Sequence, residues 1–177
     1  MFGFKTLNCS QFCVSSIMFL IAIVTVAALL MKGNSNYINS LTIKNVKKWY
    51  FGLYTALKLN NMTHEYFTID YIINDKLLRT NPMKIAGHKF KFLKLKKSLS
   101  SFGITHKDTI ACSDPEKTIL DFIYIWRYSG IPKDSIIADV DEWSTNLSIP
   151  KLKEYSKNYP KTVQKIAHKL TESVVIA

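Results

Sequence analysis

The sequence predicts an α+β domain, with a small mixed or antiparallel sheet and a helical C-terminal half, behind one N-terminal hydrophobic segment. Three observations predict this arrangement. An uncharged apolar run comes first, short runs of aromatic and β-branched residues fill the middle, and helical periodicity follows a strong helix start at Asp114-Pro115-Glu116. With 177 residues, of which 47% are hydrophobic, the chain can bury one core behind this segment.

The first 32 residues contain the hydrophobic segment, whose core at 12–31 holds 20 residues without a charge. A helix of that length spans the roughly 30 Å hydrocarbon core of a bilayer. Lys5 is the one basic side chain before it, whereas Lys32 and three further lysines follow before residue 49. The positive-inside rule therefore predicts a single-pass membrane protein whose C-terminal domain is cytoplasmic.

Two alternatives to a membrane anchor stay open. A cleaved signal peptide requires a shorter apolar core and a small-residue cleavage site, and Ala27-Ala28 is followed by large apolar residues. The segment could instead be a displaced or misread N-terminus, which would make the protein cytoplasmic. After the segment we expect a turn-rich linker at 33–42 and one basic domain at 43–177.

The order of elements in the domain follows from periodicity and turn residues. A first helix is expected over Ile43–Leu59, because apolar residues recur there at helical spacing. Asp114 should cap a later helix, with Pro115 at its first position, and Ser129-Gly130 should end it. The expected strands are 66–73, 82–86, 89–96 and 109–112, and the later helices are 115–128, 134–143, 151–157 and 162–174.

The chain is strongly basic, with a net charge of +11. After residue 31 there are 23 Lys and Arg residues against 13 Asp and Glu residues, which leaves +10 for the domain. This excess favours an anionic partner, whether nucleic acid, a lipid surface or an acidic protein, although a solvated lysine surface needs no partner. The three cysteines are scattered, which excludes a disulfide framework or a zinc site and favours a reducing compartment.

No motif for a reactive centre stands out. Nucleotide-binding, metalloprotease and hydrolase signatures are absent from the sequence, so we expect no catalytic residue, no metal and no cofactor. The four histidines are expected at the surface, and Asp139, Asp141 and Glu142 suit a solvated helix face better than a magnesium site. A nucleotidyltransferase would need paired carboxylates, but Asp70 is followed two residues later by Ile72.

Lysines alternate with apolar residues in the segment KFKFLKLK at 89–96. As one strand it would carry a row of ammonium groups that can contact an anionic partner, or form an edge strand that its lysines protect against aggregation. The alternation slips at Phe92-Leu93, which predicts a β-bulge or the end of the strand. The candidate contacts with an anionic partner are Lys89, Lys91, Lys94 and Lys96.

Three segments resemble the abortive-infection type IV antitoxin family (AbiEi-like). The block SDPEKTILDFIY at 113–124 resembles its proline-glutamate-lysine signature, and WYFGLYTAL at 49–57 resembles a helix of that family. The segment KFKF at 89–92 with Phe102-Gly103-Ile104 resembles its basic strand and the step that follows. Members resemble transcriptional regulators, with an N-terminal winged helix and a C-terminal antitoxin domain; in this chain the hydrophobic segment stands where the winged helix is expected.

The resemblance implies a signature helix whose polar residues are Asp114, Glu116, Lys117 and Asp121. An exposed Lys117–Asp121 pair would contribute only about 0.3–0.5 kcal/mol. The expected function is a non-enzymatic, membrane-tethered antitoxin-like or regulatory binding domain that counteracts a nucleotidyltransferase-like toxin. The alternatives are a nucleic-acid-binding repressor whose winged helix is truncated or misread, and a single-pass membrane protein without such a role.

Overall fold

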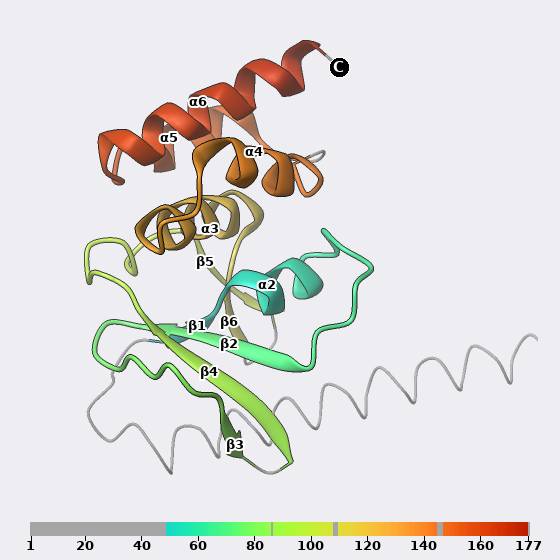
Figure 1. The fold of residues 1–177 in the computed structure, drawn as a ribbon, viewed down its shortest axis with the longest axis vertical. Coiled ribbons are helices and arrows are strands. Elements are labelled where there is room, and N and C mark those ends of the chain that lie inside the picture. The colour runs from blue at the N-terminus through green and yellow to red at the C-terminus, as the bar shows by residue number, and fades with distance from the viewer. Residues whose placement is uncertain (1–48, 86, 108–109, 145–146, 177) are drawn as a thin grey trace, which may run out of the picture.

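A mixed six-stranded sheet with five helices makes up the part of the protein that the structure describes. This computed structural model describes residues 49–176 except 86, 108–109 and 145–146. The helices stack in layers on one side of the sheet, with α3 (Pro115–Tyr128) lying closer to the strands than α5 (Ile149–Ser156) and α6 (Lys161–Ile176) (Figure 1). The α+β class with a mixed sheet and a helical C-terminal half is confirmed.

The strand order is β3-β4-β2-β1-β6-β5. Parallel pairs join β1 to β6 and β2 to β4, whereas the other neighbours are antiparallel. The strands are β1 (Trp49–Phe51), β2 (Ile69–Asn74), β3 (Met83–Ile85), β4 (His88–Lys94), β5 (Ile104–Lys107) and β6 (Ile110–Ser113).

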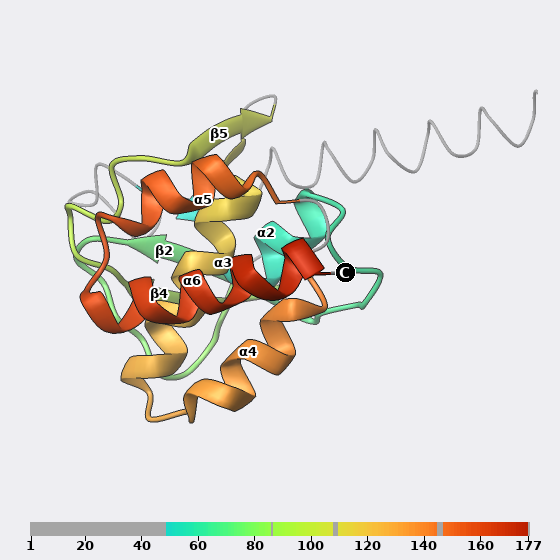
Figure 2. The same cartoon turned by 90° about the horizontal axis from the view of Figure 1, so that it is seen from above.

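The remaining helices are α2 (Leu53–Leu59), on the same side of the sheet as α3, and α4 (Lys133–Asp141). Seen from above, α6 lies between α5 and α4 (Figure 2). The four later helices lie close to the expected ranges, because a proline stands at or beside the start of each and Asp114 caps α3, and these signals are local.

The prediction of one helix over Ile43–Leu59 is wrong within the described residues. Trp49–Phe51 forms β1 in the interior of the sheet, and the helix begins at Leu53 with Gly52 as its N-cap. A Cβ atom at Gly52 would lie 2.3 Å from Ile73 Cδ1, so glycine lets the backbone turn closely over β2. The aromatic residues before it suit a strand as well as a helix, and pairing with β2 and β6 decides between them. Residues 43–48 lie outside the described part.

The sheet is apolar on both faces, which explains the slip in the lysine-rich strand. Phe90 and Phe92 of β4 belong to a cluster on one face, with Phe51, Ile72 and Cys112, whereas Leu93 and Leu95 pack with the helices on the other face. The register between β2 and β4 runs unbroken from Ile69↔Lys89 to Asn74↔Lys94. The β-bulge alternative is therefore wrong; β4 ends at Lys94, shortly after the slip, and the slip marks a strand that buries side chains in both directions.

The interpretation of this strand as a sheet edge is also wrong, because β4 lies between β3 and β2. The predicted membrane segment at 12–31 and the linker at 33–42 lie outside the described residues. Within the described part, every helix is too short or too polar to cross a bilayer.

Candidate functional site

The start of α3 carries the residues of the signature helix. Asp114 Oδ1 accepts a hydrogen bond of 2.9 Å from the Lys117 backbone N–H, and Pro115 occupies the first turn. The predicted cap is confirmed: a carboxylate at this position satisfies a free N–H group and interacts favourably with the positive end of the helix dipole. The cap fixes where Glu116 and Lys117 leave the helix.

Lys117 and Asp121 form an ion pair that is entirely inaccessible to solvent. The Lys117 Nζ to Asp121 Oδ1 distance is 2.6 Å, and both side chains are 0% exposed. The possible pair therefore forms, but in the interior, so the small energy of an exposed pair does not apply to it. Because α3 lies against the sheet, one helical turn of this face is buried, and the charges depend on each other for solvation.

Two tyrosines from distant segments complete this buried network. The Tyr50 hydroxyl in β1 donates to Asp121 Oδ2 over 2.9 Å. Tyr159, in the loop between α5 and α6, accepts from Lys117 Nζ over 2.8 Å and donates to Asp121 Oδ1 over 2.7 Å. The carboxylate thus receives three hydrogen bonds, from a strand, from its own helix and from the C-terminal helical layer.

The ammonium group of Lys117 is further enclosed by aromatic rings. It lies 5.1 Å from the ring centroid of Phe102, 5.4 Å from that of Tyr159 and 5.5 Å from that of Tyr50, distances typical of cation–π contacts. Gly103 passes close by with a φ of +63°, and a Cβ there would lie 2.8 Å from Lys117 Cβ. This packing gives a physical reason for the glycine in the Phe-Gly step.

Burial controls the protonation of this network. Desolvation lowers the pKa of Lys117 despite the attraction of Asp121, and it raises the pKa values of Tyr50 and Tyr159 well above their ordinary range, with Asp121 adding to the effect. A lysine with a lowered pKa can act as a nucleophile or base only where a substrate reaches it. Since Lys117 is sealed on all sides, the network holds the sheet to the helices.

A second polar network, closer to the surface, ties α3 to α5. Lys151 Nζ lies 3.0 Å from Asp114 Oδ2 and 3.0 Å from Glu116 Oε2. The Tyr155 hydroxyl donates to Asp114 Oδ2 over 3.1 Å, and the Ser148 backbone N–H donates to Glu116 Oε1 over 2.9 Å. Two carboxylates from the start of α3 therefore position the first turns of α5.

The charged groups of this second network also shift each other's pKa. Burial would raise the pKa of Glu116, but the Ser148 N–H and Lys151 outweigh it and lower that pKa below its ordinary value. Burial would lower the pKa of Lys151, yet its hydrogen bonds to Asp114 and Glu116 raise it. Both groups are therefore charged at neutral pH, and their attraction supports the packing of α5 on α3.

The structure does not bring the four candidate lysines of the basic segment together. Residues alternate between the two faces of a strand, so Lys89 and Lys91 lie on the helical side of the sheet and Lys94 on the opposite side. Lys96 follows the end of β4 and is exposed. An anionic partner on one face of the sheet can therefore meet Lys89 and Lys91 but not Lys94.

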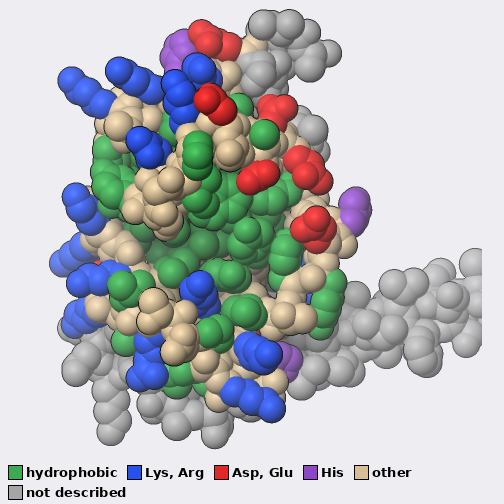
Figure 3. All heavy atoms as spheres, in the orientation of Figure 1, with side chains coloured by type: hydrophobic (Ala, Val, Ile, Leu, Met, Phe, Trp, Pro, Cys, Tyr) green, Lys and Arg blue, Asp and Glu red, His purple; other side chains and the backbone are tan. Residues whose placement is uncertain are grey.

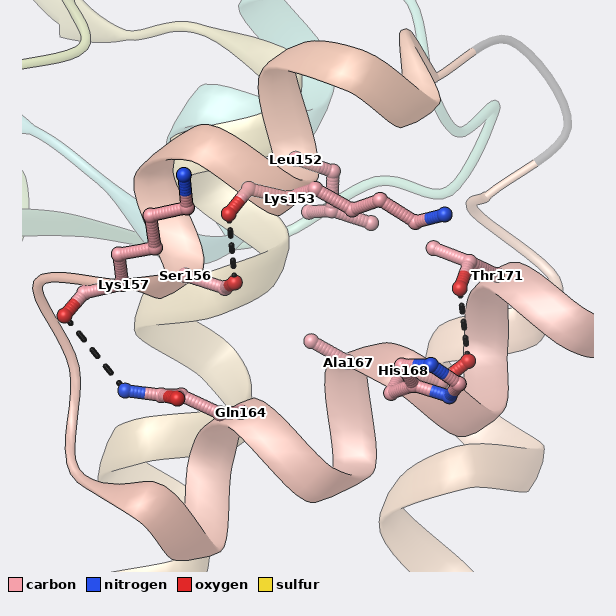
Figure 4. A pocket seen from close by; sticks show the side chains of 8 residues that line it. All are labelled: Leu152, Lys153, Ser156, Lys157, Gln164, Ala167, His168 and Thr171. Carbon is pink, nitrogen blue, oxygen red and sulfur yellow. Dashed lines mark hydrogen bonds between the residues drawn. The ribbon is translucent and has the colours of Figure 1, made fainter.

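A groove of about 200 Å³ is lined by residues of α5 and α6. Figure 4 shows Lys153 extending along it toward Thr171, while the amine of Lys157 points away. Both hydroxyls that line it donate hydrogen bonds within the protein, Ser156 to the Lys153 carbonyl and Thr171 to the His168 carbonyl. The groove is smaller than the roughly 300–1,000 Å³ of typical ligand sites, and its cationic rim is its main chemical feature.

Histidines and carboxylates form no cluster that could hold a metal ion in the described part. His64, His88, His106 and His168 are exposed, as predicted, and Asp139, Asp141 and Glu142 lie on an exposed helix face. No group of three or more metal-binding side chains occurs among the described residues.

Sequence reasoning missed the partners that give the signature helix its role. Tyr50, Tyr159, Lys151 and Tyr155 were not singled out, because they lie 35 to 71 positions from the residues they contact. A scan against models of protein families finds no match for this chain, and a search of curated proteins finds no relative.

A double-mutant cycle tests the buried pair. Lys117→Met and Asp121→Leu should each lower the free energy of unfolding by about 3–5 kcal/mol, because each leaves a buried charge without its partner. The double variant should lose clearly less than the sum of the two, as measured by chemical denaturation at neutral pH. Glu172→Gln, which breaks the exposed His168–Glu172 pair, is the control and should change stability by less than about 0.5 kcal/mol. Additive losses would contradict this assignment.

Acid should weaken the contact between α3 and α5. Because the pKa of Glu116 is lowered by folding, its ionised form stabilises the folded chain above the ordinary pKa of 4.5, and this contribution disappears as the pH falls through the lowered value. Glu116→Gln should therefore make the urea midpoint less dependent on pH below 4.5. Glu154→Gln, an exposed carboxylate of α5, is the matched control. An equal pH dependence in wild type and Glu116→Gln would rule this role out.

Proposed function

We propose that this protein is a non-enzymatic binding protein of the antitoxin type, which acts against a nucleotidyltransferase-like toxin in a type IV toxin–antitoxin pair. The observation that carries the proposal is the block at 113–124, which resembles the antitoxin signature. Its capped helix and buried Lys117–Asp121 pair form the centre of this fold. The residues that this chain has in common with the antitoxin signature are therefore those that a common architecture would need.

The residues of the signature helix are too buried or too fully paired to contact a partner directly. Lys117 and Asp121 are inaccessible to solvent, and Asp114 and Glu116 both form ion pairs with Lys151. What the domain offers to a partner is an exposed surface rich in lysine, including Lys89 on the sheet. Such a surface suits recognition of an anionic partner through complementary charge.

We further propose that the hydrophobic segment at 12–31 tethers the domain to a membrane and that the domain faces the cytoplasm. The support is the uncharged length of the segment and the lysines that follow it. A tether would confine an antitoxin to the membrane surface and raise its local concentration there. If the N-terminus is displaced or misread, the domain would act as a cytoplasmic protein.

Co-expression tests the antitoxin proposal. The full chain, produced together with a nucleotidyltransferase-like toxin encoded beside its gene, should restore the growth that the toxin arrests when expressed alone. Growth and viable counts are measured at matched toxin levels, and cell fractionation of the same cultures should recover the chain with membranes.

The Lys117→Met/Asp121→Leu pair of substitutions is the matched control for co-expression, since it alters the fold's centre without changing the exposed lysines. Persistent growth arrest with well-expressed wild-type chain would refute the antitoxin role. Recovery of the chain in the soluble fraction would refute the tether alone.

A second candidate function is binding of duplex DNA as a repressor. The observation that favours it is a set of exposed lysines on the two C-terminal helices and at the end of α5, namely Lys153, Lys157, Lys161 and Lys165. Exposed ammonium groups can contact a phosphate backbone without reading its sequence.

Salt dependence tests the repressor candidate. The full chain should be retained on duplex DNA from its own upstream region, and removing one lysine that binds a phosphate should reduce the slope of log K against log salt by about 0.9. Lys161→Gln together with Lys165→Gln should thus reduce the slope by roughly twice that amount, whereas Lys94→Gln on the sheet should not change it. No retention at low salt would exclude this candidate.

A further inference from the structure

An open groove lies where the loop between α2 and β2 meets the helical face of the sheet. Its volume is about 430 Å³, and it is lined by Tyr54, Tyr71 and the segment from Glu65 to Ile69. Figure 3 shows a broad hollowed apolar area on this face, with lysines along its left and lower borders and carboxylates to its right. The groove is separate from the two polar networks of α3.

Aromatic rings form the floor and rim of this groove. Tyr54 is in ring contact with Phe67 at 4.7 Å and with Tyr71 at 5.3 Å between centroids, and it also packs edge-on against Phe122 of α3. The rings are thus held from behind by the core while they remain partly exposed. Tyr66 stands out on the rim with 80% of its surface exposed, which is unusual for so large a side chain.

Lysines flank the rings on both sides. Lys58 Nζ lies 5.3 Å from the ring centroid of Tyr66, and Lys91 Nζ lies 6.0 Å from that of Tyr71. The parallel register pairs Ile69 with Lys89 and Tyr71 with Lys91, which places both lysines directly beside the floor of the groove. Glu65 contributes one carboxylate to the lining.

We propose that this groove binds single-stranded nucleic acid, with bases stacked on Tyr66 and the neighbouring rings and phosphates contacted by Lys58, Lys89 and Lys91. Aromatic platforms beside lysines are the arrangement by which proteins hold unpaired strands, because every base has a face that can stack. The phenols of Tyr54 and Tyr71, whose pKa values are raised by burial from an ordinary value that is already high, are neutral and do not repel phosphates.

The composition of the groove favours a nucleic acid over a protein partner. Tyrosine is enriched in both kinds of interface, but lysine is depleted from the centres of protein–protein interfaces. Here ammonium groups lie over two of the rings and beside the floor. Residues 49–177 also carry 19 basic against 13 acidic side chains, a net charge of +6. The proposal stands apart from the antitoxin role and from duplex binding by the C-terminal helices.

Fluorescence anisotropy with a labelled oligo-dT of about 12 nucleotides tests the groove. The full chain, held in a non-ionic detergent, should bind this strand more tightly than a duplex of the same length, since paired bases cannot stack on Tyr66. Tyr66→Ala should weaken binding at least about 5-fold, whereas Tyr66→Phe should retain it. Tyr66 is exposed, so these changes should leave the fold intact.

Two lysines of one strand provide a matched pair. Lys91→Ala should reduce the slope of log K against log salt by about 0.7 between roughly 50 and 200 mM salt, because it removes one phosphate contact. Lys94→Ala, on the opposite face of β4, should leave the slope unchanged.

The outcomes separate the proposal from its competitors. Weaker binding in Tyr66→Ala and Lys91→Ala, with Lys94→Ala unaffected, supports the groove. The proposal is overturned if duplex and single strand bind equally, or if Tyr66→Ala binds as tightly as wild type. Either result assigns the affinity to the lysines of the C-terminal helices. No binding of the strand at about 50 mM salt also overturns it and leaves the groove to a protein partner.

Discussion

A buried charge pair and two tyrosine hydroxyls hold the layers of this domain in one arrangement. Lys117 and Asp121 on α3 are joined to β1 through Tyr50 and to the C-terminal helices through Tyr159. Moving any layer would leave a charge or a hydroxyl without a partner in the interior. An unpaired buried polar group destabilises the folded state. The network therefore stabilises one packing of sheet on helices more specifically than apolar contacts alone would.

The local features of this fold could be predicted from the sequence, because their causes lie within a few residues. Asp114 and Pro115 define the start of α3 by satisfying and removing N–H groups in its first turn. The burial of Lys117 could not be predicted in this way, since Tyr159 lies 42 positions from Lys117 and Tyr50 lies 71 positions from Asp121. Helical spacing alone makes a Lys–Asp pair look like an ordinary surface contact.

The same distinction holds for the basic segment. Its alternation correctly indicated a strand, but which lysines share a surface depends on the neighbours of β4 in the sheet. Burial on both faces separates Lys91 from Lys94, and the register with β2 sets Lys91 beside Tyr71. The groove is lined by residues of a helix, a loop and one strand, so its lining residues share no pattern in the sequence.

The position of β1 in the sheet has a consequence for how the protein is made. β1 pairs in parallel with β6, and the partners Phe51 and Cys112 are 61 residues apart. Until the ribosome has released residue 113, β1 lacks one of its two neighbours, and the apolar residues of β2 and β4 are not covered by α3, which comes later in the chain. Closing such a distant pair is slow compared with forming helices. The sheet thus cannot be completed until more than half of the chain has been made, and before that stage its strands are open to association with other polypeptides.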